Sequence, residues 1–141
     1  MRISDASNRP EVTQRVTFDV DGEPCFIEVR STSSREYSNG LAWFKRVAAQ
    51  RAHAGVELIS VVNVAGEEVE QKTEEYQRLE AILFAHLIAD WGFDDELTLD
   101  SAAKLVIANS DIRELIDETT SLIAYAEKTA KKPQQRTQEQ S

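Results

Sequence analysis

Three consecutive carboxylates, Asp94, Asp95 and Glu96, are the side chains whose types and spacing most suggest chemistry. Hard cations bind several oxygen ligands in a defined loop, so the cluster is a candidate cation site. The calcium-loop pattern D-x-[DN]-x-[DN]-G is absent, and Asp100 is the one carboxylate that follows closely. A solvated acidic turn explains these residues better, and we expect no metal.

The two histidines, His53 and His86, and the single cysteine, Cys25, are the other candidates for metal binding or catalysis. The histidines fall on different predicted helices, and His86 lacks a Glu-x-x-His partner, so a core or interface histidine is the better interpretation. A reactive cysteine needs an electropositive neighbourhood, whereas the residues next to Cys25 are apolar or acidic. No P-loop, dinucleotide or Gly-x-Ser-x-Gly motif occurs either. We therefore expect a protein that is not an enzyme and binds no cofactor.

Composition and charge narrow the class of protein. The chain has 141 residues, of which 41% are hydrophobic and 29% charged, enough for one domain with its own core. Its net charge of −9 repels nucleic-acid phosphates and anionic membranes, so we expect protein partners, and neither nucleic acid nor membrane. The N-terminus has no apolar signal core, and no apolar run approaches the roughly 20 residues that span a bilayer. These observations indicate a protein that acts inside a cell.

We predict a single domain over residues 12–130, with a flexible segment before it (1–11) and a disordered polar tail after it (131–141). Alternating apolar residues on both sides of Asp21-Gly22 predict a β-hairpin, because both residue types tolerate the positive φ of a tight turn.

Helix signals follow the hairpin. Ser33 and Glu36 have capping-box spacing, which predicts a helix that ends near His53. Thr98 is placed to cap a short helix, and an amphipathic helix over residues 111–128 follows it.

The middle of the chain has two interpretations. Residues 56–64 are short and β-branched, which predicts a strand that pairs with the hairpin; a loop with a helical extension is the alternative. Residues 67–91 predict one long helix, charged at first and then apolar on all sides over 81–89. Such a helix must be buried by its own domain or by a partner, which favours a shared surface or self-association. The predicted fold is thus α+β and mostly α-helical: a small N-terminal β-hairpin, with 56–64 as a third strand if it pairs there, packed with about four helices.

Bulky apolar residues bracket the acidic connector at residues 92–97 and could form a hot spot for a partner, because Trp is enriched in such sites. The alternative is a corner of the chain's own core, and the sequence favours neither. The candidate partner-binding residues are Leu83, Leu87, Trp91, Phe93 and Leu97.

Residues 67–100 contain eleven carboxylates and only two basic residues, Lys72 and Arg78. Carboxylates spaced like phosphates would let the protein mimic DNA and occupy a nucleic-acid binding protein. A solvated acidic helix face is the more common explanation.

The C-terminal half combines an apolar helix that runs into a tryptophan, an acidic connector, a short helix begun by threonine, and a last amphipathic helix. These features are residues 83–91, 92–97, 98–108 and 111–128. In this combination the chain resembles the tail assembly chaperones of long-tailed bacteriophages, over roughly residues 80–130 and more loosely elsewhere. The looser matches are the hairpin sequence Val-Asp-Gly-Glu, the aromatic pair Trp43 and Phe44, and the polar tail after Pro133.

The resemblance implies a non-enzymatic protein in the cytoplasm of a bacterial host. Such chaperones coat the tape measure protein, which is long, helical and apolar, and keep it soluble. They also help to recruit tail tube subunits, so the tape measure protein and the tail tube protein are the partners that the resemblance implies. A structural component of the finished tail is a related alternative, and an acidic inhibitor that mimics DNA is an alternative of another class.

Overall fold

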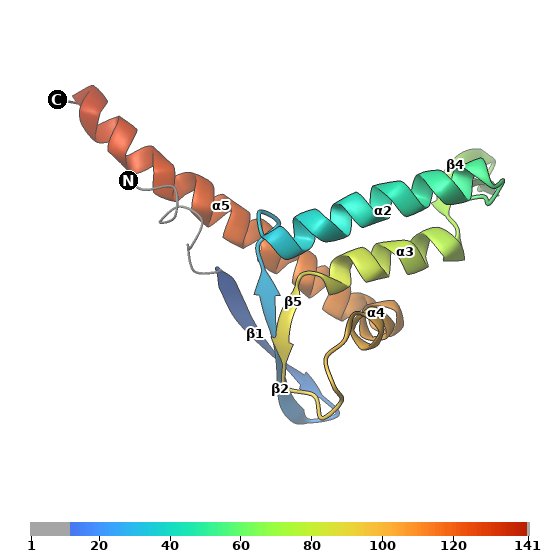
Figure 1. The fold of residues 1–141 in the computed structure, drawn as a ribbon, viewed down its shortest axis with the longest axis horizontal. Helices are drawn as coiled ribbons and strands as arrows, with labels where there is room; N and C mark the ends of the chain where they lie inside the picture. The colour runs from blue at the N-terminus through green and yellow to red at the C-terminus, as the bar shows by residue number, and fades with distance from the viewer. Residues whose placement is uncertain (1–11, 141) are drawn as a thin grey trace.

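The computed structural model describes residues 12–140. The described part consists of four helices, a three-stranded antiparallel sheet and a separate two-stranded hairpin (Figure 1). The predicted α+β class is therefore confirmed. The predicted flexible segment 1–11 lies outside the described residues.

The N-terminal hairpin pairs β1 (Thr13–Val20) with β2 (Glu23–Arg30), as predicted. Asp21 and Gly22 have φ values of 51° and 85°, so the connection is a tight turn that requires positive φ at both residues. Turns of this kind match the right-handed twist of the two strands, which is why the Asp-Gly pair was informative.

The third strand of the sheet is β5 (Ile88–Trp91), which lies antiparallel to β2 on the side away from β1. Residues 56–64 do contain a strand, as predicted, but the pairing of that strand with the N-terminal hairpin was wrong. The strand that does pair with the hairpin is distant in sequence, and two of its residues pair with Ile27 and Val29 of β2. β2 is therefore the central strand, and Ile27 and Val29 are both deeply buried.

The first long helix, α2 (Arg35–His53), starts one residue later than predicted and ends where predicted. Its N-cap is Ser34, whose hydroxyl accepts a hydrogen bond from the amide of Tyr37 at 3.2 Å. We expected Ser33 to cap the helix. Its hydroxyl is instead held by the preceding loop and by the C-terminal helix, so it cannot turn toward the helix amides.

Residues 59–91 differ most from the prediction. β3 (Ile59–Val64) and β4 (Glu67–Lys72) pair with each other in a second hairpin, separate from the first. The single long helix expected over residues 67–91 is therefore wrong, because this segment contains β4, α3 (Glu74–Ala85) and β5.

Two local features explain the error. Ala65 and Gly66 adopt φ values of 53° and 87°, so they form a tight turn that starts β4. Thr73 then begins α3: its hydroxyl oxygen accepts a hydrogen bond from the amide of Tyr76 at 3.3 Å and donates one to the carbonyl of Leu58 at 3.1 Å. The glutamates of β4 favour helices in isolation, and the turn before them overrides that preference.

The last two helices follow the acidic connector. Thr98 caps α4 (Leu99–Ala108) as predicted, since its hydroxyl accepts a hydrogen bond from the amide of Ser101 at 3.0 Å. α5 (Ser110–Gln140) begins directly afterwards. Its backbone stays helical over residues 131–140, where we expected a disordered tail.

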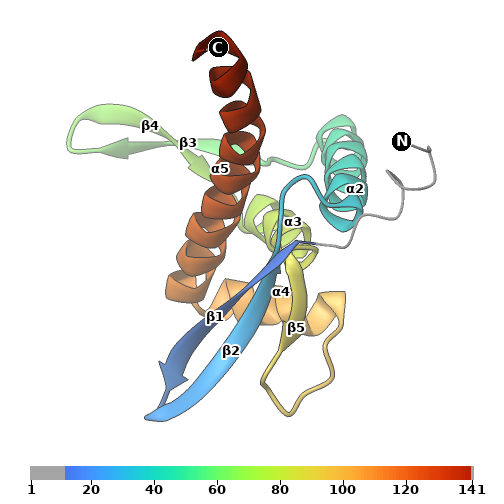
Figure 2. The same ribbon diagram turned by 90° about the vertical axis from the view of Figure 1, so that its left-hand side faces the viewer.

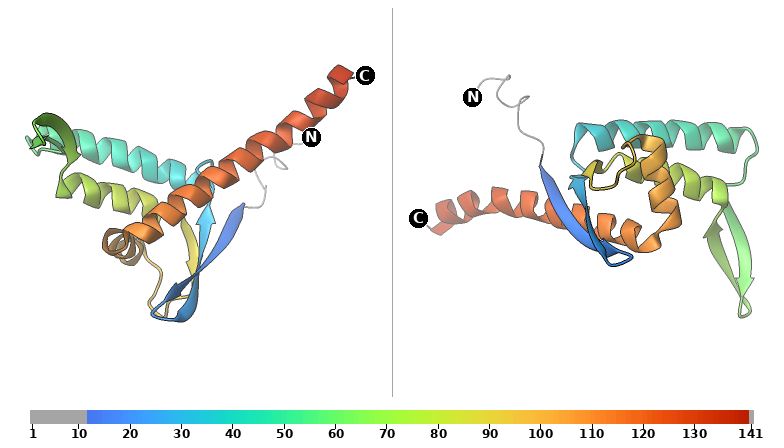
Figure 3. Two further views of the ribbon diagram at one scale, coloured as in Figure 1. Left: turned by 180° about the vertical axis from the view of Figure 1, so that it is seen from behind. Right: turned by 90° about the horizontal axis from the view of Figure 1, so that it is seen from below.

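The helices enclose one side of the sheet. α2 and α3 run antiparallel and side by side, and α4 packs against α3 (Figure 1). α5 crosses β1 and β2, as the view from behind shows (Figure 3). The core lies where these elements meet, and its most deeply buried members include Ile27, Leu87, Ala102, Val106 and Ile116.

Candidate interaction surfaces

Three of the five residues predicted to bind a partner lie inside the molecule. Leu83, Leu87 and Trp91 are 7%, 1% and 9% exposed, because the end of α3 and the strand β5 are covered by their neighbours. Phe93 and Leu97 are partly buried against the same core. In this structure the five side chains stabilise the chain's own interior.

The acidic connector is attached to that core, as the alternative of an intramolecular corner requires. The indole N–H of Trp91 donates to the carbonyl of Asp95 at 2.9 Å. The Trp91 ring also packs edge-to-face on Phe93, with 5.2 Å between centroids, and Phe93 in turn contacts Phe18 of β1. These contacts fix the path of the connector between β5 and α4.

The residues considered for metal binding or catalysis are not brought together. Within the described residues, no group of three or more His, Cys, Asp or Glu side chains could hold a metal ion. Cys25 is a free thiol that is partly buried, His53 is exposed at the end of α2, and the connector carboxylates Asp94, Asp95 and Glu96 are all exposed.

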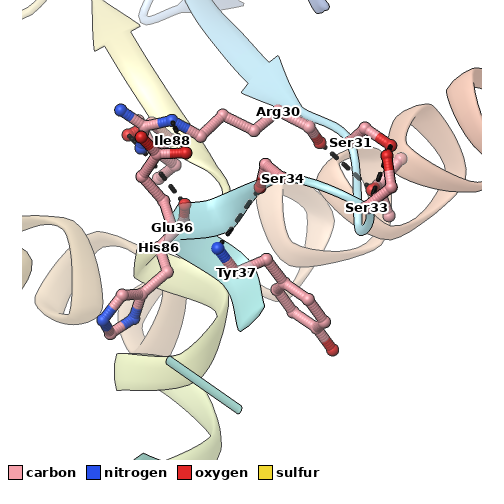
Figure 4. Close-up of polar contacts among 9 residues, drawn as sticks. Arg30, Ser31, Ser33, Ser34, Glu36, Tyr37, His86 and Ile88 are labelled. Carbon is pink, nitrogen blue, oxygen red and sulfur yellow. Dashed lines mark hydrogen bonds and ion pairs between the residues drawn. The ribbon is translucent and has the colours of Figure 1, made fainter. Parts of the chain in front are cut away.

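A polar junction joins β2 to α2 and β5 (Figure 4). Arg30, at the end of β2, donates from Nη1 to the carbonyl oxygens of His86 and Ile88 at 3.1 and 3.0 Å. Its Nε also lies 3.8 Å from a carboxylate oxygen of Glu36, in the first turn of α2. The guanidinium therefore satisfies two carbonyls at the point where α3 gives way to β5, and it holds the start of α2 nearby.

Two serines beside this junction contact a carboxylate. The hydroxyls of Ser31 and Ser33 lie 2.8 Å apart, and Ser33 donates to Oε2 of Glu127 in α5 at 2.9 Å. A nucleophilic serine needs a base within hydrogen-bonding reach, most often a histidine. The hydrogen bonds of the two serines join them to each other and to Glu127, whereas Nδ1 of His86 donates to the carbonyl of Ile82 at 2.8 Å. The serine cluster is therefore a joint between the β2–α2 loop and α5.

A groove of about 790 Å³ lies between β1 and α5, and the sequence did not predict it. One wall follows β1 over residues 14–17. The other wall is one face of α5, because its members are three, four and seven residues apart. Within this wall Ile123 is buried, at 6% exposed, whereas Leu122 is 68% exposed. The α5 residues that line the groove are Thr119, Leu122, Ile123, Ala126 and Glu127.

The groove could bind a protein segment in two ways, through the edge of β1 and through its apolar lining. Among the described strands, β1 pairs only with β2, so the backbone of its other edge is open. Val12 and Val16 on the β1 side and the apolar residues of α5 form a mostly apolar lining. A partner could therefore bury apolar side chains in the groove and contact a strand edge at the same time.

The hairpin β3–β4 is the second surface that the sequence did not reveal. Its apolar side chains are largely exposed, and Val61 and Val64 are 63% and 57% exposed. On the neighbouring strand, Glu67, Glu68 and Glu70 are exposed as well. The hairpin therefore presents an apolar strand and an acidic strand next to each other.

Comparison of the chain with protein-family models, with curated proteins and with solved structures finds no match. Along the described part of the chain, none of the helices is both long enough and apolar enough to cross a membrane.

Proposed function

We propose that this chain is a tail assembly chaperone of long-tailed bacteriophages, which binds apolar helical segments of the tape measure protein and helps tail tube subunits to assemble around it. The observation that carries the proposal is the apolar groove between β1 and α5. The resemblance over residues 80–130 supports the choice of partner. In this proposal the protein acts in the cytoplasm of the bacterial host.

The groove suits an amphipathic helix. Such a helix places apolar side chains at positions i, i+3, i+4 and i+7, and they would pack on the matching face of α5 around Leu122 and Ile123. A site of this size gives modest affinity, so a growing tail tube could displace each copy. Many copies along one long partner would supply the total binding energy.

The acidic surface has a separate role in the proposal. A net charge of −9 on each copy makes coated partners repel one another, which opposes aggregation of an apolar protein.

The test is co-expression with a tape measure protein, followed by size-exclusion chromatography with light scattering. We expect the tape measure protein to become soluble and to elute with several copies of this chain. Leu122→Asp places a charge in the lining of the groove and should abolish co-elution. Ile107→Asp, at a 57% exposed site of α4 outside the groove lining, is the matched control and should leave co-elution unchanged. Equal effects of the two variants would contradict binding in the groove, and a tape measure protein that still precipitates would contradict the function.

An acidic inhibitor that mimics DNA is the second candidate, and the exposed glutamates of β4 are the observation that favours it. Three other carboxylates of the acidic segment form ion pairs within the chain: Glu75 with Arg51 at 3.1 Å, Glu80 with Lys72 at 2.8 Å and Asp100 with Lys104 at 3.1 Å. This candidate predicts capture of a DNA-binding protein with an affinity that falls steeply with salt, and insensitivity to Leu122→Asp. A structural tail component, the third candidate, would remain in purified virions.

A further inference from the structure

The hairpin β3–β4 projects from the far end of the α2–α3 pair (Figure 2). It makes no extensive contact with any other described element. A two-stranded hairpin by itself is marginally stable in water, because further strands or a packed face are needed to stabilise it. Here each face carries exposed apolar side chains, which are Ile59 and Val61 on one face and Val64 and Val69 on the other. The hairpin therefore resembles part of a larger sheet, to which further strands could be added.

The two edges of the hairpin differ in their chemistry. β3 reads Ile-Ser-Val-Val-Asn-Val and contains neither a charged residue nor a proline, whereas β4 reads Glu-Glu-Val-Glu-Gln-Lys. Proteins commonly protect exposed strand edges with charges or proline, which prevent pairing with another chain. β4 has this protection and β3 does not, so β3 is the edge that can accept another strand.

We propose that the open edge of β3 binds a second copy of this chain through antiparallel β3–β3 pairing. A strand that pairs there should itself be uncharged and β-branched, and β3 of a second copy meets both conditions. Antiparallel pairing of two identical strands is compatible with two-fold symmetry, in which the same surface is used on both copies. A pair centred on Val61 or Val62 places valines opposite each other across the new interface.

Electrostatics favours this pairing over the other edge. In a β4-β3-β3-β4 sheet the two acidic strands are outermost, three strand spacings or about 14 Å apart. This separation exceeds the Debye length of about 8 Å at physiological salt, so their repulsion is largely screened. Pairing through β4 would instead bring Glu68 and Glu70 of two copies to within roughly 5 Å of one another, which is destabilising.

The experiment measures the mass of the purified chain by size-exclusion chromatography with light scattering over a range of concentrations. The wild-type chain should dimerise. Val61→Lys places a charge in the middle of β3 and should weaken the dimer by at least about tenfold in Kd, because two lysines then lie close across the interface. Val69→Lys is the matched control, since it puts the same exposed charge on β4 of the same hairpin, and it should change the Kd less than about twofold.

Hydrogen exchange gives an independent readout of the same pairing. Amides of residues 59–64 should become more protected as the protein concentration rises, while those of β1 should not change. A chain that stays monomeric, or a dimer that Val61→Lys and Val69→Lys weaken equally, would overturn the proposal. Protection of β3 only when a tape measure protein is present would assign the edge to that partner and would overturn it too. The mass measurement and the concentration series use this chain alone, so their result does not depend on the proposed chaperone function; the tape measure protein is added only in a separate exchange measurement.

Discussion

Gly40 in α2 lies so close to the imidazole of His86 that a Cβ atom at position 40 would be 2.6 Å from Cγ of the ring. The ring is held in place because Nδ1 donates to the carbonyl of Ile82 at 2.8 Å. A glycine inside a helix costs about 1 kcal/mol relative to alanine. Because glycine has no side chain, α2 can approach the end of α3, where His86 is the C-cap.

Gly40→Ala should lower the free energy of unfolding by about 1 kcal/mol, because the clash with the ring outweighs the better helix propensity. In a His86→Ala background the same substitution should become stabilising, by up to about 1 kcal/mol, since the obstacle is gone. Urea denaturation followed by circular dichroism measures all four proteins of this cycle. The exposed neighbour Asn39→Ala is the control, and it should have a small effect in both backgrounds. A Gly40→Ala effect of the same sign with and without His86 would contradict the close contact.

Arg30→Met should lower the free energy of unfolding by about 1–3 kcal/mol. The substitution keeps an apolar stem but leaves the carbonyls of His86 and Ile88 without the donor that they have now. Arg15→Met is the matched control, because the Arg15 side chain is 55% exposed and its pair with Glu28 at 2.9 Å should contribute less than about 1 kcal/mol. Chemical denaturation of both variants measures the free energy of unfolding. Equal decreases would show that Arg30 stabilises the fold no more than the exposed ion pair of Arg15 does.

The pKa of Tyr37 is raised above its usual value near 10, first by burial and then by the negative charges of Asp117 and Glu80. The folded state therefore holds the phenolic proton more tightly than the unfolded state does. This contribution to stability is fully present below pH 10, and it is lost as the pH rises from about 10 through the raised pKa of the folded state.

Tyr37→Phe should flatten the decline in melting temperature above about pH 10, because the replacement has no proton to lose. Melting curves by circular dichroism over this pH range, compared with the wild-type chain, test the prediction. Tyr125→Phe removes a tyrosine that is 68% exposed, and this control should retain the wild-type slope. A Tyr37→Phe profile parallel to the wild type would argue against burial of Tyr37.

Ala65→Asn should stabilise the β3–β4 hairpin by about 0.5–1 kcal/mol. Ala65 has a φ of 53°, a conformation that costs an L-residue energy and that asparagine tolerates better, and Asn-Gly is the preferred pair for this turn. Slower hydrogen exchange over residues 59–72 is the expected observation. Asp21→Ala in the other hairpin is the converse change and should speed exchange in β1 and β2. The prediction fails if exchange in β3 and β4 is unchanged.

Local signals in the sequence were sufficient to predict an element where its own residues determine its conformation. The Asp21-Gly22 turn and the Thr98 cap were both predicted correctly, since positive φ and hydroxyl capping act within a few residues. The assignment of residues 67–91 to one helix failed for the opposite reason. Glutamates and small apolar residues favour helices locally, and only pairing with β2, about sixty residues away, makes Ile88–Trp91 a strand.

The candidate surfaces could not be predicted for the same physical reason. Leu83, Leu87 and Trp91 are apolar whether they face a partner or the core, and their burial depends on what packs over them. The groove requires β1 and α5 to lie together, although about a hundred residues separate them. The periodicity of α5 did reveal which face is apolar, but not that this face is left partly uncovered.

The distribution of the core along the chain also constrains how the protein folds during synthesis. Its buried residues extend from Ile27 in the second strand to Ile123 in the last helix. A ribosome that adds about 5–20 residues per second needs on the order of 5–20 seconds to make the chain between them. Throughout that interval the core lacks the apolar side chains that α5 contributes, such as Ile116 and Ile123. The complete core can therefore form only after α5 has been translated, so its last packing step follows synthesis of nearly all of the described chain.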